Sequence, residues 1–355
     1  MNILICIGRL YMGGIEKYAM DLALGLKNRD HNVHLLVFFQ ILNSEKKQLL
    51  LNEGITVHEL LLKSGKDLRL PIRFGRLLRL IKPDIIHLNI LPFLAVIPLI
   101  FYRNKTVYTI HQIANNKFVA KIYSFVIKGI IGISKNVKEV LKNQNGFFQR
   151  NYWTVINNGI VLNDVKIPDY ASGIINLVMV SRLAQDKQPD HAIEILNYLH
   201  TNSNLDYELT LVGNGDIDDD SFTKMLKEKV KNFGLENKVH FVGWHEDVSE
   251  YLLKSQGFLM LSRLECFPYS VIEAIAHGVP VFSYKIEGGL HDLHINHETG
   301  IVSDKNDPVS LALKIDNVFK DPTVWKKFSD QAFQRSKSFS VEKMVQETEH
   351  FYFNL

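Results

Sequence analysis

The chain alternates between short apolar runs, which predict buried β-strands, and longer stretches with helical periodicity. Strands and helices that alternate in this way predict a parallel sheet covered by helices on both faces. The predicted strands are 3–7, 33–39, 85–88, 107–110, 129–133 and 153–156 in the first half, and 177–180, 209–212, 239–242, 257–261 and 279–283 in the second.

The run 163–173 is the expected linker, because the alternation of strands and helices restarts after it. The sequence therefore predicts an α/β fold with two doubly wound, Rossmann-like domains that face each other across a cleft, residues 1–165 and 170–335. The last segment, 336–355, contains an amphipathic helix over 341–353 that we expect to dock back on the first domain.

Residues 85–102 are the one candidate for a membrane-spanning segment. A spanning helix needs about 20 mostly apolar residues. This stretch contains two polar residues and two prolines, namely His87, Asn89, Pro92 and Pro98. Because proline interrupts helical hydrogen bonding, the sequence favours a short strand followed by a buried helix.

The composition is that of a soluble globular protein, with 46% hydrophobic and 22% charged residues among 355. We find no signal-peptide pattern, and we expect the two cysteines, Cys6 and Cys266, to be reduced in a cytosolic protein. The net charge of +3 conceals an asymmetry, because residues 1–165 hold 22 lysines and arginines against 10 aspartates and glutamates, whereas the remainder holds 19 against 28. The basic first half is expected to face an anionic partner.

Two carboxylates, Glu265 and Glu273, stand eight positions apart around a turn. A predicted strand ends just before them at Leu261, and a helix predicted over 270–277 contains the second carboxylate. Both acids thus lie where open α/β sheets bind ligands and where backbone amides hold phosphate. A carboxylate beside an apolar helix needs hydrogen-bond donors, and sugar hydroxyls are natural ones. Cys266 is expected to be a small spacer, since no His–Asp pair accompanies it.

Arg182 and Lys187 follow the first strand of the second domain. A guanidinium can bind a diphosphate bidentately and an ammonium adds a point charge, so the two can converge on one diphosphate; a solvated surface pair is the alternative. In the first domain Gly13 and Gly14 open a helix and either offer backbone N–H groups to a ligand or form a plain N-cap turn. The pattern is not Gly-x-Gly-x-x-Gly, which disfavours nicotinamide binding.

Other polar residues at predicted strand ends allow both functional and structural interpretations. His111 can hydrogen-bond a sugar hydroxyl or be a structural histidine, and His87 is a weaker case of the same kind. Asn214 lies in a glycine-rich turn that looks ligand-facing. The acidic run 216–220 resembles a metal-binding Asp-x-Asp, but aspartates before a helix more often cap it. No His/Cys cluster has metal spacing, so we expect no metal.

Two segments, 63–82 and 117–128, combine lysines and arginines with apolar residues at helical spacing. A basic amphipathic helix can lie on an anionic membrane surface, and an ordinary surface helix is the alternative. The charge of the first domain favours peripheral contact with the inner face of a membrane. Nucleic acid is a less suitable partner, because no recognition motif is visible and the second half is acidic.

Together these motifs resemble the retaining GT-B glycosyltransferases of family GT4, and the resemblance covers nearly the whole chain. Glu265 and Glu273 match the family's Glu-x7-Glu motif, which is its most specific part. Arg182 and Lys187 match its paired cations. The glycine loop at 13–14 is similar to that of its first domain.

The resemblance implies roles for these residues in binding a nucleotide-sugar. Glu273 would hold the donor ribose, Glu265 the hydroxyls of the transferred sugar, and His111 the sugar near its reacting carbon. Arg182 and Lys187 would neutralise the diphosphate. Cys266 and Gln188 stand where the family usually has glycine, and 287–292 follows its Gly-Pro-x-Glu turn only loosely. The remaining donor-binding residues would be Gly13, Gly14, Asn214, Gly243, Trp244, Cys266, Phe267, Pro268, Tyr269 and Ser270.

The resemblance further implies transfer of a hexose or N-acetylhexosamine, from UDP in preference to GDP, to a bacterial cell-surface glycan such as lipopolysaccharide or to a lipid-linked acceptor. Because no residue stands out as a covalent nucleophile, we expect attack on the leaving-group face with retention of configuration and without a cofactor. Two alternatives remain, namely a nucleotide-sugar epimerase or hydrolase on the same fold and a non-catalytic, membrane-associated binding protein.

Overall fold

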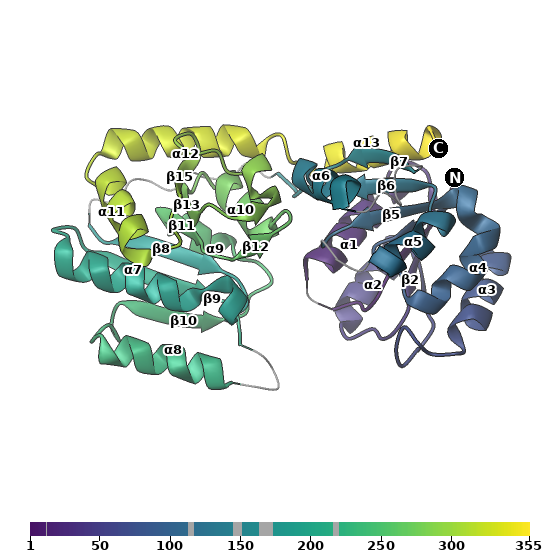
Figure 1. The fold of residues 1–355 in the computed structure, drawn as a ribbon, viewed down its shortest axis with the longest axis horizontal. Helices are drawn as coiled ribbons and strands as arrows, with labels where there is room; N and C mark the ends of the chain where they lie inside the picture. The colour runs from purple at the N-terminus through teal and green to yellow at the C-terminus, as the bar shows by residue number, and fades with distance from the viewer. Residues whose placement is uncertain (12, 113–116, 145–150, 163–172, 216–219) are drawn as a thin grey trace. The chain divides into compact units, whose positions relative to one another are not determined.

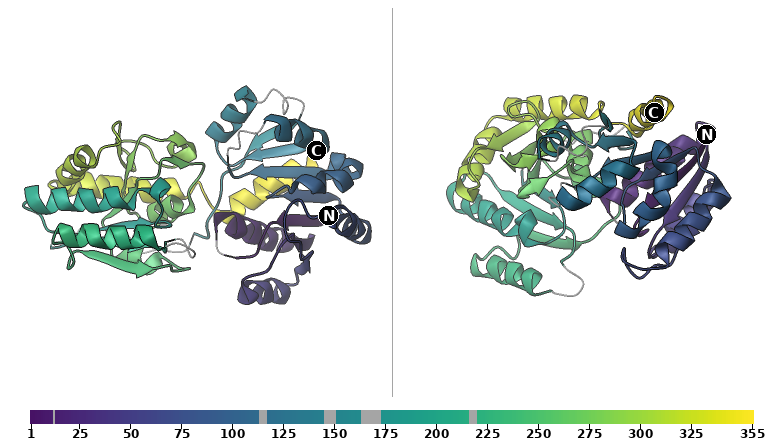
Figure 2. Two further views of the ribbon diagram at one scale, coloured as in Figure 1. Left: turned by 60° about the horizontal axis from the view of Figure 1, so that its bottom comes forward. Right: turned by 45° about the vertical axis from the view of Figure 1, so that its right-hand side comes forward.

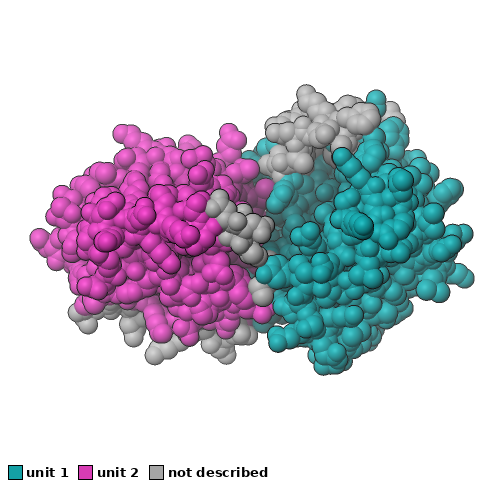
Figure 3. All heavy atoms as spheres, turned by 90° about the horizontal axis from the view of Figure 1, so that it is seen from below, with its two compact units in different colours: residues 1–161, 340–355 teal, residues 162–339 magenta. Residues whose placement is uncertain are grey.

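The structure, a computed structural model, describes residues 1–11, 13–112, 117–144, 151–162, 173–215 and 220–355. The chain forms two compact units, which Figure 3 distinguishes by colour. Unit 1 comprises Met1–Val161 together with Ser340–Leu355, and unit 2 comprises Leu162–Phe339. All but the last residue of the expected linker, 163–173, lie outside the described residues.

Unit 1 is built on a parallel sheet whose described strands follow the order β3-β2-β1-β4-β5-β6-β7 (Figure 1). Its central strands are buried on both sides, which is why they read as continuous apolar runs. The strand order reverses between β1 and β4, so the loops at their carboxyl ends diverge and leave room for a ligand. The strands are β1 (Asn2–Ile7), β2 (Asn32–Val37), β3 (Thr56–Glu59), β4 (Ile85–Leu88), β5 (Thr106–Ile110), β6 (Gly129–Gly132) and β7 (Tyr152–Val155).

Right-handed crossovers distribute the helices of unit 1 over both faces of this sheet. α1 and the C-terminal α13 pack together on one face, and α3, α4 and α5 form a contiguous row on the other (Figure 2). The helices are α1 (Gly14–Lys27), α2 (Ser44–Asn52), α3 (Leu70–Ile81), α4 (Val96–Leu99) with the flanking 3-10 turns η1 (Phe93–Ala95) and η2 (Ile100–Lys105), α5 (Lys117–Val126), α6 (Lys135–Gln144) and α13 (Val341–Phe353).

Unit 2 repeats this design with the strand order β10-β9-β8-β11-β13-β15, which reverses between β8 and β11. The strands are β8 (Ile175–Val180), β9 (Tyr207–Val212), β10 (Val239–Gly243), β11 (Gly257–Met260), β13 (Val281–Tyr284) and β15 (Gly300–Ser303), with a short extra pair β12 (Leu264–Glu265) and β14 (Glu287–Gly288). The helices are α7 (Pro189–Asn202), α8 (Ser221–Asn232), α9 (Ser249–Leu253), α10 (Tyr269–Ala276), α11 (Pro308–Phe319) and α12 (Pro322–Ser336), with 3-10 turns η4 (Gln185–Lys187) and η5 (Gly289–Asp292).

The predicted fold class, two parallel α/β sheets, is confirmed, and every predicted strand forms. The prediction missed the two edge strands β3 and β15 as well as the short pair β12 and β14. β3 alternates polar and apolar residues and is only partly buried, whereas β15 holds two apolar residues between Gly300 and Ser303. Neither strand has an apolar run long enough to be recognised.

The prediction for 85–102 is correct for the strand and partly wrong for the helix. β4 is fully buried, as predicted. The helical segment that follows is buried only on its inner side, and it exposes Phe93, Ile97 and Phe101 on the other. None of the described helices combines the length and the apolar composition that crossing a bilayer requires.

The C-terminal helix α13 is held on unit 1 by a buried polar network. The Tyr352 hydroxyl contacts His87 Nδ1, and His87 Nε2 lies 2.7 Å from Thr109 Oγ1. Farther along the helix, Glu349 binds Arg29 at 2.6 Å. His87 is fully buried and both its ring nitrogens have partners, so it is a structural histidine. Because a buried polar group is costly without a partner, this network specifies where α13 docks.

The chain returns to unit 1 through a close backbone approach. Ile160 and Ser340 form an isolated parallel bridge, and Val341 N donates to Ile160 O at 3.0 Å. A Cβ atom at Gly159 would lie 2.4 Å from Ser340 O, so only glycine fits there.

We expect Tyr352→Phe to destabilise unit 1 by about 1–3 kcal/mol, because it leaves a buried His87 nitrogen without its partner. Urea denaturation of the full chain and amide hydrogen exchange in α13 measure the effect. The matched control is Tyr152→Phe, at an exposed tyrosine of β7, which should change stability by less than about 0.5 kcal/mol. Equal effects of the two substitutions would contradict this account of α13.

Candidate active site

The charged residues predicted in unit 2 lie where its strand order reverses. The loop after β8 carries Arg182 and ends its 3-10 turn at Lys187, and the loop after β11 carries Glu265. A backbone hydrogen bond from Arg263 N to Asp186 O, 2.9 Å long, ties the two loops together. The fold therefore joins side chains that are 78 positions apart in the sequence.

Lys187 and Glu265 form an ion pair, with 2.7 Å between Nζ and Oε1. Their side chains are 17% and 18% exposed, so solvent screens this pair less than an ordinary surface pair. Asp186 Oδ2 lies 3.5 Å from Lys187 Nζ and 3.7 Å from Nη2 of Arg182, which is 73% exposed. The structure thus brings both predicted cations to one carboxylate, and an anion that enters this edge meets them together.

Glu265 is positioned by a glycine that the sequence alone did not identify as important. β12 pairs with β14, and Gly288 in β14 has φ +119°, a conformation that favours glycine. A Cβ atom at Gly288 would lie 1.9 Å from Glu265 O. The segment 287–292 therefore has a structural task, because it lies directly against the backbone of Glu265.

Helix α10 begins at the same edge of the sheet. Pro268 is its N-cap residue and makes no side-chain capping hydrogen bond, so the amides of the first turn, at Tyr269 and Ser270, present the positive end of the helix dipole to this edge. Glu273 lies in the second turn and is partly exposed. Cys266, just before the helix, is buried, as a spacer would be.

The residues expected near the nucleotide base form a second group on neighbouring loops. Asn214 Oδ1 accepts a hydrogen bond from Trp244 N at 3.1 Å, and Gly213 N donates to Gly243 O at 2.7 Å. Gly213 has φ +142°, and a Cβ atom there would lie 1.9 Å from Ser181 O. The loops after β8, β9 and β10 are therefore packed together, and the side chain of Trp244 is left exposed beside them.

In unit 1, His111 follows β5 and binds Asn89, which follows β4, with 2.9 Å between His111 Nε2 and Asn89 Oδ1. Asn89 Nδ2 donates to Cys6 O at 3.4 Å, which assigns Oδ1 as the acceptor toward the histidine. His111 Nε2 therefore carries the hydrogen and Nδ1 has the lone pair. Burial lowers the pKa of His111 to about 3, so the ring is neutral at physiological pH. Tyr18 packs edge-on against it at 4.9 Å between ring centroids.

Gly13 and Gly14 lie at the start of α1, near the carboxyl end of β1. Gly13 has φ 174°, an extended conformation that any residue adopts, so left-handed backbone is not the reason for glycine here. A Cβ atom at Gly13 would lie 2.6 Å from Glu16 Oε2. Glycine therefore leaves room for Glu16, whose pKa is raised by burial. A ligand role for this loop stays a prediction.

The structure corrects one interpretation and leaves another open. Asp220 is the N-cap residue of α8, but its side chain makes no capping hydrogen bond, so capping does not explain that aspartate. Residues 216–219 of the acidic run lie outside the described residues, as does the side chain of Lys117 in the basic segment 117–128. Across the described ranges, no group of three or more His, Cys, Asp or Glu side chains is arranged to hold a metal ion.

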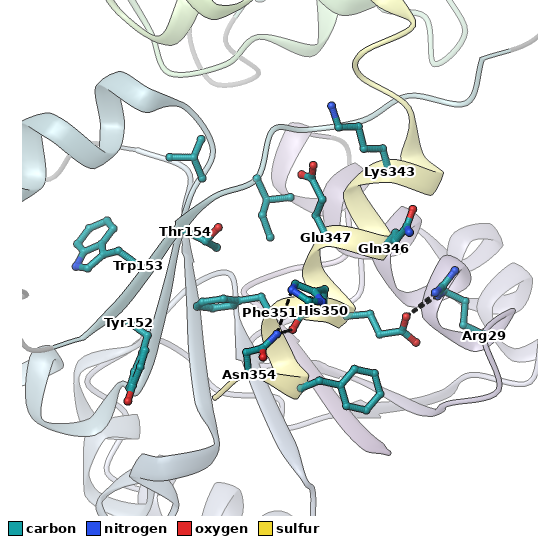
Figure 4. Close-up of a pocket in the computed structure, with 14 residues that line it drawn as sticks. Arg29, Tyr152, Trp153, Thr154, Lys343, Gln346, Glu347, His350, Phe351 and Asn354 are labelled. Atoms are coloured by element: carbon teal, nitrogen blue, oxygen red, sulfur yellow. Dashed lines mark hydrogen bonds and ion pairs between the residues drawn. The ribbon is translucent and has the colours of Figure 1, made fainter.

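A cavity of about 1040 Å³ lies elsewhere in unit 1, between the edge strand β7 and α13 (Figure 4). Tyr152, Phe351 and Phe353 give it aromatic walls, and its Arg29 is already paired with Glu349. None of the predicted site residues lines it. This cavity is therefore separate from the candidate site.

Comparison with known proteins gives two family models that match successive parts of the chain. The model described as "Glycosyltransferase Family 4" matches residues 12–164, and "Glycosyl transferases group 1" matches residues 171–335. The capsular polysaccharide biosynthesis glycosyltransferase CapH of Staphylococcus aureus is 24% identical over 305 residues, which cover 81% of this chain and 82% of CapH.

Two further comparisons bear on function and on fold. An α-1,4-N-acetyl-D-galactosaminyltransferase of Campylobacter jejuni, named for a GalNAc-GalNAc-diNAcBac-PP-undecaprenol acceptor, is 28% identical over 173 residues, 48% of this chain and 46% of that protein. The crystal structure of Anabaena HepE in complex with UDP and glucose matches with a TM-score of 0.85 at 20% identity, over 100% of both chains.

The chain spans between 18% and 45% of the length of three other curated relatives that it matches. The two family models lie one after the other and each coincides with one of the parallel-sheet units. The chain therefore belongs to the GT-B glycosyltransferases of family GT4, with a Glycosyltransferase Family 4 domain followed by a Glycosyl transferases group 1 domain.

Proposed function

We propose that this chain is a retaining glycosyltransferase that moves a hexose or N-acetylhexosamine from a nucleotide-sugar, with UDP favoured, to a growing cell-surface glycan or a lipid-linked acceptor. The observation that carries the proposal is the shielded ion pair of Lys187 with Glu265 at the strand-order reversal of unit 2. Anabaena HepE, whose fold matches over both domains, binds UDP and glucose, which supports UDP as the donor nucleotide.

The pair is suited to a nucleotide-sugar because its two members prefer different parts of that ligand. A diphosphate would take over the ammonium of Lys187 and recruit the exposed Arg182 from Asp186. Glu265 would then be released to accept hydrogen bonds from hydroxyls of the transferred sugar. Glu273 would hold the ribose hydroxyls, and Trp244 would lie near the base. The N-terminus of α10 adds favourable potential for the phosphates.

The reaction breaks the bond between the anomeric carbon and the diphosphate oxygen. Negative charge grows on the diphosphate while the sugar becomes oxocarbenium-like, so cations at the leaving group stabilise the transition state. The acceptor oxygen bonds the anomeric carbon on the face that the diphosphate leaves, and its proton passes to a diphosphate oxygen. Configuration is retained without a covalent intermediate. Neutral His111 would accept a sugar hydroxyl through Nδ1 without adding positive charge beside the oxocarbenium.

The acceptor side of the proposal rests on unit 1 and on the relatives. CapH acts in capsular polysaccharide biosynthesis, and the Campylobacter jejuni enzyme is named for an undecaprenol-linked acceptor. We propose that this chain works in the cytoplasm at the inner face of the membrane, where the basic segments 63–82 and 117–128 make peripheral contact and a lipopolysaccharide-type or other lipid-linked glycan is the acceptor. No metal or other cofactor is required by this chemistry.

The function is tested by screening nucleotide-sugars for thermal stabilisation of the full chain and then following the best donor by NMR with a lipid-linked acceptor. We expect UDP-sugars to raise the melting temperature most and the product to keep the donor's anomeric configuration. An inverted product or a trapped glycosyl–enzyme adduct would reject the mechanism. Conversion of the donor without any acceptor would instead indicate an epimerase or hydrolase, and no turnover at all would indicate a binding protein.

Substitutions at two site residues should separate binding from turnover. Glu273→Ala should raise the Kd for the nucleotide-sugar about 10–100-fold, because it removes charge-assisted hydrogen bonds worth about 1.5–3 kcal/mol. Arg182→Ala should lower kcat about 100-fold with little change in Kd, because its contact strengthens as charge develops. Calorimetry and steady-state kinetics measure the two effects. The control is Glu236→Ala at an exposed carboxylate of unit 2, and native kinetics in both site variants would reject the site.

The neutral state of His111 predicts a distinctive pH response. Its pKa of about 3 keeps native activity free of a His111 limb between pH 5 and 8. In Asn89→Asp a carboxylate replaces the amide and raises the histidine pKa toward its ordinary value, so the imidazolium forms as the pH falls and Nδ1 loses its lone pair. We expect kcat/KM of the variant to fall roughly tenfold from pH 7.5 to 5.5. A pH profile parallel to that of the native chain would show that the Asn89 contact does not set the state of His111.

A further inference from the structure

The row of helices α3, α4 and α5 carries an exposed apolar surface. Residues 93–105 form one continuous helical segment, in which Phe93, Ile97 and Phe101 recur every four positions and so share a side. With Ile100 they form what we call the apolar ridge, whose four side chains are between 45% and 86% exposed. Because Leu99 and neighbouring residues on the inner side are buried, the segment is apolar on both sides, unlike an ordinary surface helix.

The two neighbouring helices extend this surface. α3 lies next to α4, where a Cβ atom at Gly75 would be 3.6 Å from Pro98 Cβ. Along the outer side of α3, exposed Ile72 and Leu80 alternate with the exposed cation Arg76. On the other flank α5 exposes Phe125. Apolar groups on three adjacent helices are more than the isolated exposed residues of a typical surface.

The ridge is bordered by cations that carboxylates do not neutralise. Arg79 donates to Gly75 O at 3.3 Å and Lys105 to Pro83 O at 3.1 Å, so both are held at backbone carbonyls. In the described part of the chain, Arg76, Lys82 and Arg103 form no ion pair either, whereas Arg69 binds Asp67. This combination of an apolar centre and a positive border complements an interface that is apolar inside and anionic outside.

We propose that the apolar ridge inserts into the interfacial layer of an anionic phospholipid bilayer, with the cations of α3 and η2 held at the lipid phosphates. This deepens the membrane contact of the proposed function, on which it rests for the acceptor, by replacing attraction between charges with insertion of defined side chains. The ridge begins four residues after Asn89, which binds His111. A lipid-linked acceptor in the same bilayer would therefore reach the edge of the sheet where the candidate chemistry of unit 1 lies.

The test is co-sedimentation of the full chain, without donor, on vesicles of phosphatidylglycerol and phosphatidylcholine at physiological salt. The double variant Ile97→Ser/Phe101→Ser should bind at least tenfold more weakly, because it removes inserted apolar area. The matched control is Val309→Ser/Leu313→Ser on α11 of unit 2, where side chains of similar character are 44% and 47% exposed; it should bind like the native chain. Equal vesicle affinity of the native chain and the ridge variant overturns the proposal.

The cations make a separate, salt-dependent contribution. Arg76→Gln/Arg79→Gln should weaken binding and flatten its dependence on ionic strength, because exposed charges are screened by salt. Vesicles of phosphatidylcholine alone should bind the native chain at least tenfold more weakly than the anionic ones. Equal binding to both kinds of vesicle overturns the role of anionic lipid.

A conservative substitution reports insertion directly. Phe101→Trp should shift tryptophan emission to the blue and bring quenching by brominated lipid when anionic vesicles are added, whereas Val309→Trp should give neither. If Phe101→Trp shifts only with protein concentration and not with vesicles, the ridge is instead an interface between copies of this chain. Stabilisation of the ridge variant by UDP is measured in parallel, so that loss of membrane binding with an intact donor response is distinguished from failure of the proposed function.

Discussion

The reversal of strand order within each sheet decides where chemistry can collect in this chain. At β8 and β11 it directs two loops to one edge, and the ion pair of Lys187 with Glu265 follows from that placement. At β1 and β4 the same topology places Asn89 beside the loop of His111. Neither contact is local in sequence, so both depend on the complete parallel sheet beneath them.

The site also shows how close backbone packing supports charged side chains. Gly213 and Gly288 both have positive φ, and at each a Cβ atom would lie 1.9 Å from a carbonyl oxygen of the neighbouring loop. These glycines let the loops lie directly against each other, which fixes the backbone of Glu265 and of Ser181, just before Arg182. The side chains can then exchange partners while their backbone stays in place.

The sequence was sufficient for the fold and for the charged residues of unit 2, for definite physical reasons. Central parallel strands are buried on both faces and read as apolar runs, and a charged residue just after such a run must lie at the ligand-binding edge. Asn89 and Asp186 were missed because their importance comes from partners on other loops. The apolar ridge was mistaken for core, since apolar composition does not reveal which side of a helix is covered.

The bridge of Ile160 with Ser340 has a consequence for how the two units relate along the chain. Unit 1 is assembled from both ends of the polypeptide, so unit 2 is in effect an insertion within it, entered and left at one spot. During synthesis, unit 1 stays incomplete until the final sixteen residues, Ser340–Leu355, emerge, whereas unit 2 already has its whole sequence. The nucleotide-side domain can therefore mature before its companion does.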